Sequence, residues 1–156
     1  MKTNILGLDT QKTQEISTAL NELLSSFQTY YQNLRGIHWN IKGKQFFELH
    51  VKFEELYNDA NMKVDEIAER VLTLGEVPLH TFEDYQEKSK VAVGKNVSKD
   101  ADAVQLIVTS LSSLLQVERY ILNLSDDAND EGTNSLMSDL ITEQEKTIWM
   151  MQSWLG

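Results

Sequence analysis

The sequence has no cysteine, one proline and seven glycines among its 156 residues. The absence of cysteine excludes disulfides, thiolate metal sites and a catalytic thiol. Because proline and glycine are the main breakers of regular structure, their scarcity favours long helices over many short strands. A chain of this length is expected to form one domain, residues 1–156, and it can bury enough surface to fold without a disulfide or a structural metal.

Basic residues are also scarce, with 14 Lys and Arg against 24 Asp and Glu, for a formal net charge of −10. This charge disfavours binding to nucleic acid phosphates, so we expect no nucleic acid partner. No apolar run approaches the roughly 18 residues of a membrane-spanning helix, so we expect no membrane partner. The N-terminal segment lacks the apolar stretch of a secretory signal, and the expected compartment is the cytoplasm.

Apolar residues recur at three- and four-residue spacing in four segments, which predicts four long amphipathic helices. They cover about residues 11–39, about residues 45–74, a segment that opens after Ser98, and about residues 131–155. Ser98 is the expected N-cap of the third helix, which should end at the acidic stretch 126–130. The first and last connections are short, so the helices that they join should be antiparallel neighbours.

The middle connection, about residues 75–99, is too long for a structureless loop in a small domain. It is predicted to hold a short helix near residues 82–88. A connection of this length can run back along the bundle and start the third helix in the direction of the second. That arrangement is an all-α, ferritin-like four-helix bundle with one long crossover. The alternative is an up-down bundle with an irregular excursion.

On a helical wheel, the segment 45–74 has three faces rather than two. An apolar stripe, expected to face the bundle, contains Leu49, Phe53, Leu56, Tyr57, Ala60, Val64, Ile67 and Val71. A mixed-charge face, expected to face water, contains Lys52, Glu55, Asp59, Lys63, Glu66 and Arg70. Between them lies a third face, the polar sector, which contains His50, Glu54, Asn58, Asn61, Asp65 and Glu69.

The polar sector holds three carboxylates and an imidazole but no Lys or Arg. Charged surface faces usually mix signs, as the neighbouring face does, so this sector has room for a cation supplied from outside. Imidazole and carboxylate together suit Fe, Mn or Zn. The sequence therefore predicts a metal site here, with a second solvated face as the alternative.

Spacing within the polar sector indicates that one chain holds only half of each site. His50 and Glu54 are one helical turn apart, and so are Asp65 and Glu69, so each pair can present two ligands to one metal. Glu54 and Asp65 are separated by about 16 Å along a helix, whereas metal–ligand bonds are about 2 Å. Either two half-sites exist, or an antiparallel copy of the helix brings Asp65 and Glu69 opposite His50 and Glu54.

The other two histidines lie outside this helix. His38, at the end of the first helix, could reach the second helix across the short turn 42–44, and it is expected to join the site as a further ligand. The alternative for His38 is a packed or capping histidine. His80, two residues after Pro78 in the crossover, is expected to be a surface residue.

These residues resemble a known family, the Dps mini-ferritins (DNA-binding proteins from starved cells). The resemblance is carried by the spacing His-x11-His-x3-acid-x10-Asp-x3-Glu and by segments 38–43 (HWNIKG), 46–50 (FFELH), 53–57 (FEELY) and 65–70 (DEIAER). Segment 145–150 (EKTIWM) is a weaker match. The resemblance extends over about residues 10–156.

The resemblance implies a subunit of a hollow homododecameric shell with ferroxidase centres at twofold interfaces. One subunit would give His38, His50 and Glu54, and its partner would give Asp65 and Glu69. The family oxidises Fe(II), preferably with hydrogen peroxide rather than oxygen, stores the ferric mineral inside and so limits oxidative damage. The implied metal is therefore iron, at a di-iron or mono-iron centre.

The sequence departs from the family pattern in two places. Position 54 is commonly Asp in the family, and Glu54 is one methylene longer, which bears on the second metal position. The basic N-terminal tail that gives some members DNA binding is missing, since only Lys2 precedes Thr10. We therefore expect no DNA binding despite the family name.

Two functional hypotheses follow, a ferroxidase and a non-enzymatic shell that sequesters metal or binds the nucleoid. Trp39 could carry an electron or quench a radical, although interface packing is the favoured alternative. Asp126, Asp127 and Asp130 could line a cation pore, with a solvated acidic turn and an N-cap as the alternative. No Glu-x-x-His occurs in the chain, which excludes the bundle-core site that classical ferritins build from that pair.

Overall fold

Five helices make up most of the chain in the computed structural model, which describes residues 1–156. Four of them are long: α1 (Thr10–Asn40), α2 (Phe46–Thr73), α4 (Asp100–Asp127) and α5 (Glu131–Leu155). The fifth, α3 (Phe82–Lys88), is short and lies between α2 and α4. The predicted all-α class and the predicted short helix are both confirmed.

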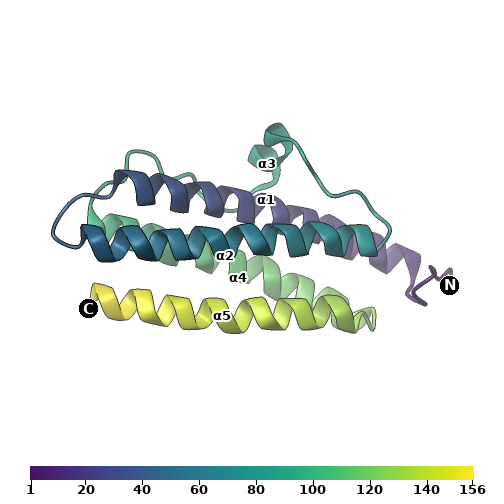
Figure 1. Cartoon of the computed structure of the whole chain (residues 1–156). Helices are drawn as coiled ribbons and strands as arrows, with labels where there is room; N and C mark the ends of the chain where they lie inside the picture. Colours follow the sequence, from purple (N-terminus) through teal and green to yellow (C-terminus); the bar gives the residue numbers. More distant parts are fainter.

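The long helices form two antiparallel pairs, α1 with α2 and α4 with α5, which pack side by side (Figure 1). The backbone N–H of Lys42, just after α1, donates to the carbonyl of Ser98 at 2.9 Å, and Lys42 pairs with Lys99 as an isolated parallel bridge. This contact places the start of α4 beside the end of α1. Helices α2 and α4 therefore run in the same direction, which confirms the ferritin-like bundle with one long crossover.

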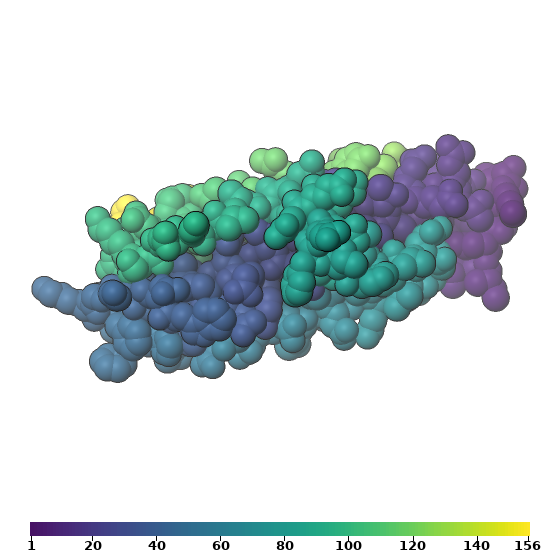
Figure 2. Space-filling model, turned by 90° about the horizontal axis from the view of Figure 1, so that it is seen from above, coloured from purple at the N-terminus to yellow at the C-terminus, as the bar shows by residue number.

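The crossover is fastened to α1 on both sides of α3. The Asn21 side chain accepts from the N–H of Leu79 at 2.8 Å and donates to a second crossover carbonyl at 3.1 Å. Asn33 donates to the carbonyl of Ala92 and accepts from the N–H of Gly94, both at 2.9 Å. Parts of the crossover backbone thus form hydrogen bonds with two side-chain amides instead of with the backbone of a helix or strand. Figure 2 shows the teal crossover residues spread over the middle of the bundle.

The apolar stripe of α2 faces the bundle as predicted. All eight of its residues are in the hydrophobic core or packed against it, namely Leu49, Phe53, Leu56, Tyr57, Ala60, Val64, Ile67 and Val71. Helix α2 ends at a glycine with positive φ, Gly75 (φ 90°), whose N–H donates to the carbonyl of Leu72 at 2.9 Å. The residues that follow cannot continue the helix, and the chain turns into the crossover.

The mixed-charge face of α2 is less solvated than predicted, because part of it packs against α5. Lys63 forms an ion pair with Glu143 at 3.0 Å, and only 13% of its side chain is exposed. Arg70 binds the buried carboxylate of Asp130 at 2.6 Å and donates to the hydroxyl of Thr133 at 2.9 Å. The prediction of a wholly solvated face is therefore wrong at Lys63 and Arg70, whose long side chains bridge two helices.

One predicted helix boundary differs in detail. Helix α4 is preceded by Lys99, which makes no side-chain capping bond, so the prediction that Ser98 caps α4 is wrong. Helix α4 ends at Asp127, within the predicted stretch 126–130, and Asn129 just beyond it has a left-handed backbone (φ 55°). Asp130 then caps α5 by accepting from the N–H of Thr133 at 3.1 Å.

A polar contact lies inside the bundle between α4 and α5. The side-chain amide of Gln144 donates to Oε2 of Glu118 at 2.7 Å, and both side chains are buried. Burial raises the pKa of the Glu118 carboxyl to about 8. The second oxygen of Glu118 and the amide oxygen of Gln144 have no hydrogen-bond partner. Glu118 is therefore a neutral acid at neutral pH.

Candidate metal centre

His38 and His50 lie face to face where α1 ends and α2 begins. Their ring centroids are 3.8 Å apart, and the ring planes differ by 10°. Nδ1 of His38 lies 2.6 Å from the backbone oxygen of His50, and Nδ1 of His50 lies 2.7 Å from the backbone oxygen of His38. The expectation that His38 reaches the second helix is confirmed. Its role as a ligand stays a prediction.

This reciprocal pairing fixes the tautomer that each ring adopts when it is neutral. A backbone carbonyl can only accept, so each Nδ1 must carry a proton and donate it. The lone pair of each neutral ring is then on Nε2, the nitrogen that a metal would take. Metal-binding histidines typically donate their other ring N–H to a carbonyl or carboxylate in this way. Two stacked imidazoles, each with an Nε2 atom that could bind a metal, thus lie at one end of the bundle.

Aromatic neighbours hold the two imidazoles in place. The ring of Phe46 stacks on His50 at 4.9 Å, and the ring of Tyr57 meets His38 edge-on at 5.3 Å. His38 is buried and His50 is half-buried. Ligands whose rotamers are fixed by packing give a better-defined site than mobile surface side chains.

Glu54 lies one turn after His50 and is held by Tyr57. The phenol of Tyr57 donates to Oε1 of Glu54 at 3.3 Å. Partial desolvation raises the pKa of Tyr57, and the Glu54 carboxylate raises it further. The phenol therefore remains a hydrogen-bond donor at neutral pH and leaves the second oxygen of Glu54 free.

A row of aromatic rings and one guanidinium connects this corner with Trp39. Tyr57 meets Tyr31 edge-on at 6.0 Å, and the guanidinium of Arg35 lies 5.5 Å from the centre of Tyr31 and 4.7 Å from the centre of Trp39. Trp39 is 56% exposed. A large exposed indole, held by a cation–π contact, is available to pack against another subunit.

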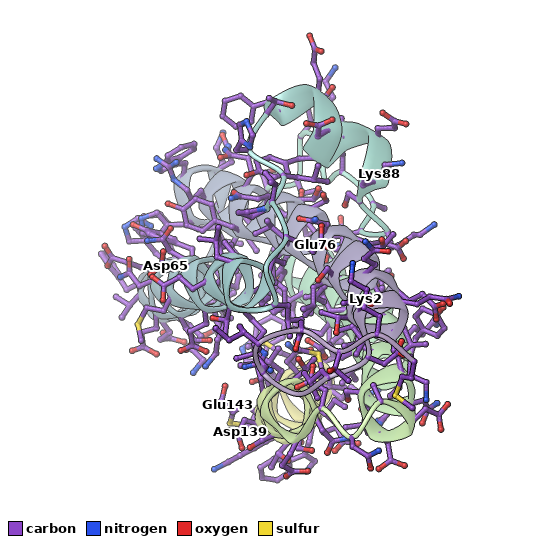
Figure 3. The ribbon with its side chains drawn as sticks, turned by 90° about the vertical axis from the view of Figure 1, so that its right-hand side faces the viewer. Lys2, Asp65, Glu76, Lys88, Asp139 and Glu143 are labelled. Carbon is purple, nitrogen blue, oxygen red and sulfur yellow. The ribbon has the colours of Figure 1, made fainter.

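The other predicted ligands, Asp65 and Glu69, lie further along the same helix and are exposed. In Figure 3, Asp65 is on the side of α2 that faces away from α5, where Glu143 is labelled. No three His, Asp or Glu side chains of the single chain come together as a metal-binding group. The structure thus brings His38 and His50 together, and it leaves Asp65 and Glu69 apart from them. Glu54 lies one helical turn after His50 and is bonded to Tyr57.

The three aspartates considered as pore residues have two different environments. Asp126 and Asp127 are exposed at the end of α4, where the ammonium of Lys12 donates to the carbonyl of Asp127 at 2.5 Å. Asp130 is buried, and its carboxylate is occupied by Arg70 and by the start of α5. Asp130 therefore has a capping role, and Asp126 and Asp127 are the remaining pore candidates.

Tyr57 and Phe46 are site residues that the sequence did not reveal as such. Tyr57 was assigned only to the apolar stripe, although it follows Glu54 by three residues and therefore lies close to it on a helix. That spacing was the available signal. The stacking of Phe46 on His50 had no comparable signal, because it depends on how the turn between α1 and α2 folds.

None of the five helices combines the length and the apolar character that crossing a bilayer requires.

A family model described as the ferritin-like domain matches residues 17–156, which is most of the chain. A DNA protection during starvation protein of Porphyromonas gingivalis is 36% identical over 150 residues, covering 96% of this chain and 94% of that protein.

Solved structures agree with the family match. The crystal structure of a Dps protein from Vibrio cholerae O1, described as a member of a broad superfamily of ferritin-like diiron-carboxylate proteins, is 47% identical. It has a TM-score of 0.97 and covers 100% of this chain and 98% of that one. A Dps protein from Bacillus brevis is 30% identical, with a TM-score of 0.91 and full coverage of both chains. The chain therefore belongs to the Dps family of ferritin-like proteins.

Proposed function

We propose that this protein stores and detoxifies iron. It oxidises Fe(II) to Fe(III), with hydrogen peroxide as the preferred oxidant, and holds the ferric mineral inside a hollow shell of twelve subunits. Iron is the substrate and the cargo. The membership of this chain in the Dps family supports a role in iron chemistry. The Vibrio cholerae relative, which is described as a member of the ferritin-like diiron-carboxylate superfamily, supports the same role. The specific reaction is our proposal.

The observation that carries the proposal is the reciprocal bonding of His38 and His50. Each Nδ1 is bonded to the backbone of the other histidine, so both Nε2 atoms are free to bind iron. Glu54, bonded to Tyr57 and one helical turn after His50, would add a carboxylate when iron binds. Two neutral imidazoles with carboxylates are a ligand set suited to Fe(II), and anionic ligands then favour Fe(III).

The centre is completed by a second subunit. On a straight helix, Asp65 lies about three turns beyond Glu54, about 16 Å along the axis, and Glu69 lies one turn further. Neither side chain can reach back to the histidines of its own chain. An antiparallel copy of α2 against the polar sector would bring them there and would form two identical centres per dimer. The exposed apolar side chains of Trp39 and Leu72, 56% and 58% exposed, support an interface at this face.

The proposed reaction balances with two ferrous ions. Each Fe(II) gives one electron, the O–O bond of hydrogen peroxide breaks, and two protons complete two water molecules. Because both electrons reach the same peroxide, no hydroxyl radical is released. Glu54 is longer than the aspartate common in the family, so we propose that it reaches further toward the second iron position.

The test mixes the intact protein with Fe(II) and substoichiometric peroxide and follows ferric absorbance. Oxidation by the variant H50A/D65A should fall at least about tenfold, since it loses one ligand from each half-site. E66Q is the matched control, because Glu66 is an exposed carboxylate on the same helix outside the polar sector. Equal rates for the parent and H50A/D65A would show that the site is assigned wrongly.

The shell and the partners can be tested separately. Size-exclusion chromatography with light scattering should give a mass near twelve times the 17.9 kDa subunit mass, and a mass of one or two subunits would contradict the shell. With a net charge of −10, the protein should not retard DNA in a low-salt mobility-shift assay. A clear shift without added divalent metal would favour the nucleoid-binding alternative.

A further inference from the structure

Tyr57 contacts the proposed iron centre in two ways. Its ring meets the ring of His38 edge-on, with 5.3 Å between the ring centroids. Its hydroxyl donates to Oε1 of Glu54 at 3.3 Å. One side chain thus contacts a proposed imidazole ligand and a proposed carboxylate ligand. The orientation of Glu54 uses the hydroxyl only as a donor and gives no task to the phenol as a group that can be oxidised.

A second phenol lies behind the first. The ring of Tyr31 on α1 meets Tyr57 edge-on, with the ring centroids 6.0 Å apart, and both side chains are half-buried. Aromatic rings at this separation are in contact. Because the rate of electron transfer falls steeply with distance, contact between rings favours it. Both contacts lie within one chain, so a partner subunit on the polar sector does not remove them.

Trp39 is less suited than Tyr57 to give up an electron. The guanidinium of Arg35 lies 4.7 Å from the centre of the indole ring. An indole that loses an electron becomes a cation, and a neighbouring positive charge opposes this. A phenol that loses its proton together with the electron becomes a neutral radical instead. The hydrogen bond from Tyr57 to Glu54 gives that proton a place to go.

The reduction of hydrogen peroxide to water requires two electrons, and one Fe(II) supplies only one. Breaking the O–O bond with a single electron releases a hydroxyl radical. In the proposed function the other electron comes from a second Fe(II), yet ions that bind separately reach the centre one at a time. A centre that holds one Fe(II) therefore needs another electron donor in contact with its ligands.

We propose that Tyr57 supplies the second electron when a single Fe(II) occupies the centre, and that the oxidised state is shared with Tyr31. This role rests on the proposed function, which provides the Fe(II) and the hydrogen peroxide. Fe(II) and the phenol of Tyr57 each lose one electron, and the O–O bond breaks. The phenol proton, which leaves through Glu54, and one proton from solvent complete two water molecules.

The products of this step are Fe(III), two water molecules and a neutral tyrosyl radical. The next Fe(II) gives its electron to the radical, and the phenol takes a proton back. Two Fe(II) are then consumed per peroxide, as in the reaction of a centre that holds both ions. Tyr57 thus allows the two ions to react in succession without the release of a hydroxyl radical.

The first test is freeze-quench EPR spectroscopy of the intact oligomer, mixed with peroxide and with less than one Fe(II) per subunit. The parent should form a tyrosyl radical, and its EPR signal should narrow when the protein contains ring-deuterated tyrosine, a comparison that needs no substitution. Y57F should lose most of this signal, and Y31F should form the radical but lose it faster. Y120F is the matched control, because Tyr120 is an exposed tyrosine of α4 that makes no ring contact with Tyr57 or Tyr31.

Spin trapping of hydroxyl radical separates electron donation from the orientation of Glu54. Loss of the hydrogen bond to Glu54 by itself slows oxidation without raising the yield of hydroxyl radical per Fe(II). Y57F should therefore release several-fold more hydroxyl radical than the parent at less than one Fe(II) per subunit. Both proteins should release little when Fe(II) saturates the centre. Equal yields from Y57F and the parent at low Fe(II) would overturn the role of Tyr57.

The outcomes distinguish this role from the ferroxidase itself. A parent that oxidises Fe(II) with peroxide but forms no tyrosyl radical would overturn the role of Tyr57 and leave the ferroxidase intact. A radical that persists in Y57F and disappears in W39F would identify Trp39 as the donor and would overturn it as well. A parent that oxidises no Fe(II) with peroxide would refute the proposed function and the role of Tyr57 together.

Discussion

Replacing Glu118 with glutamine should stabilise the protein, and the gain should increase with pH. Burial raises the pKa of this carboxyl from 4.5 to about 8, against the opposing effects of the Gln144 hydrogen bond and the Arg119 charge. The native state therefore keeps a proton that the unfolded chain releases. Because the native pKa is the higher one, stability is fully present below about pH 4.5 and is lost as the pH rises to about 8.

The size of the effect follows from the same two pKa values. Each pH unit between them changes the free energy of unfolding by about 1.4 kcal/mol, so Glu118 destabilises each parent subunit by about 3 kcal/mol at pH 7. The loss approaches about 5 kcal/mol above pH 8. The glutamine of E118Q cannot ionise, and its amide oxygen can still accept the hydrogen bond from the side chain of Gln144.

The assay is urea unfolding followed by circular dichroism at pH 5, 6, 7 and 8, with the parent and E118Q at equal subunit concentration. Equal concentration matters because the stability of an oligomer depends on it. The difference between the two proteins should be small at pH 5 and should widen with each step. E145Q is the matched control, because Glu145 is an exposed residue of α5 that forms an ion pair with Arg119 of α4. This substitution should change the free energy of unfolding by less than about 1 kcal/mol at any pH.

A constant difference between E118Q and the parent from pH 5 to pH 8 would refute the reasoning. It would mean that Glu118 titrates near its ordinary pKa and is charged inside the bundle at neutral pH. A difference that shrinks as the pH rises would reverse the sign and would require a native-state interaction that favours the carboxylate. Either result would show that the contact between Glu118 and Gln144 involves an ionised acid.

Three further predictions concern other parts of the fold. G132A should lower the free energy of unfolding by about 2 kcal/mol. The new Cβ would lie 2.7 Å from the Arg70 guanidinium and would displace that guanidinium from the buried carboxylate of Asp130, and thermal unfolding of the two proteins measures the loss of stability. N33L should cost about 2 kcal/mol by removing two hydrogen bonds to the crossover, and faster hydrogen exchange should be confined to the crossover and its contacts. Y57F should slow iron oxidation about two- to tenfold without changing the unfolding midpoint by more than a few degrees, since it loses only the exposed bond that orients Glu54. Unchanged Fe(II) kinetics in Y57F would show that Glu54 needs no such orientation.

Much of the fold could be predicted from the sequence because an amphipathic helix has apolar residues at a regular three- and four-residue spacing. The apolar stripe of α2 and the short helix at residues 82–88 were both predicted at the positions where the structure has them. The end of the second helix near residue 74 was also predicted, and the residue that follows it, Gly75, has the left-handed backbone of a helix terminator. The cap at Ser98 was wrong because α4 begins one residue later, after Lys99, and the carbonyl of Ser98 pairs with the N–H of Lys42.

Side-chain contacts between different helices, or between a helix and the crossover, produce no regular spacing in the sequence. No spacing in the sequence distinguishes Asn21 and Asn33 from other polar residues of α1, yet they bind both halves of the crossover. Lys63 was predicted to face water, and no pattern in the sequence marks Glu118 as buried. Their roles depend on which helix lies opposite, and the periodicity of one helix does not contain that information. Side-chain amides and long cations are therefore the residues at which prediction from the sequence alone was weakest.

The candidate site lies between these two cases. Spacing along α2 was enough to indicate that His50 and Glu54 form one half-site and that Asp65 and Glu69 form another, since a rigid helix keeps them about 16 Å apart. Spacing could not indicate which nitrogen of each histidine is available, because that depends on the backbone carbonyl beside the ring. The structure supplies a carbonyl for Nδ1 in all three cases. Only at His38 and His50 do two such rings stack on each other, so the structure adds to the spacing the donor atom of each proposed ligand.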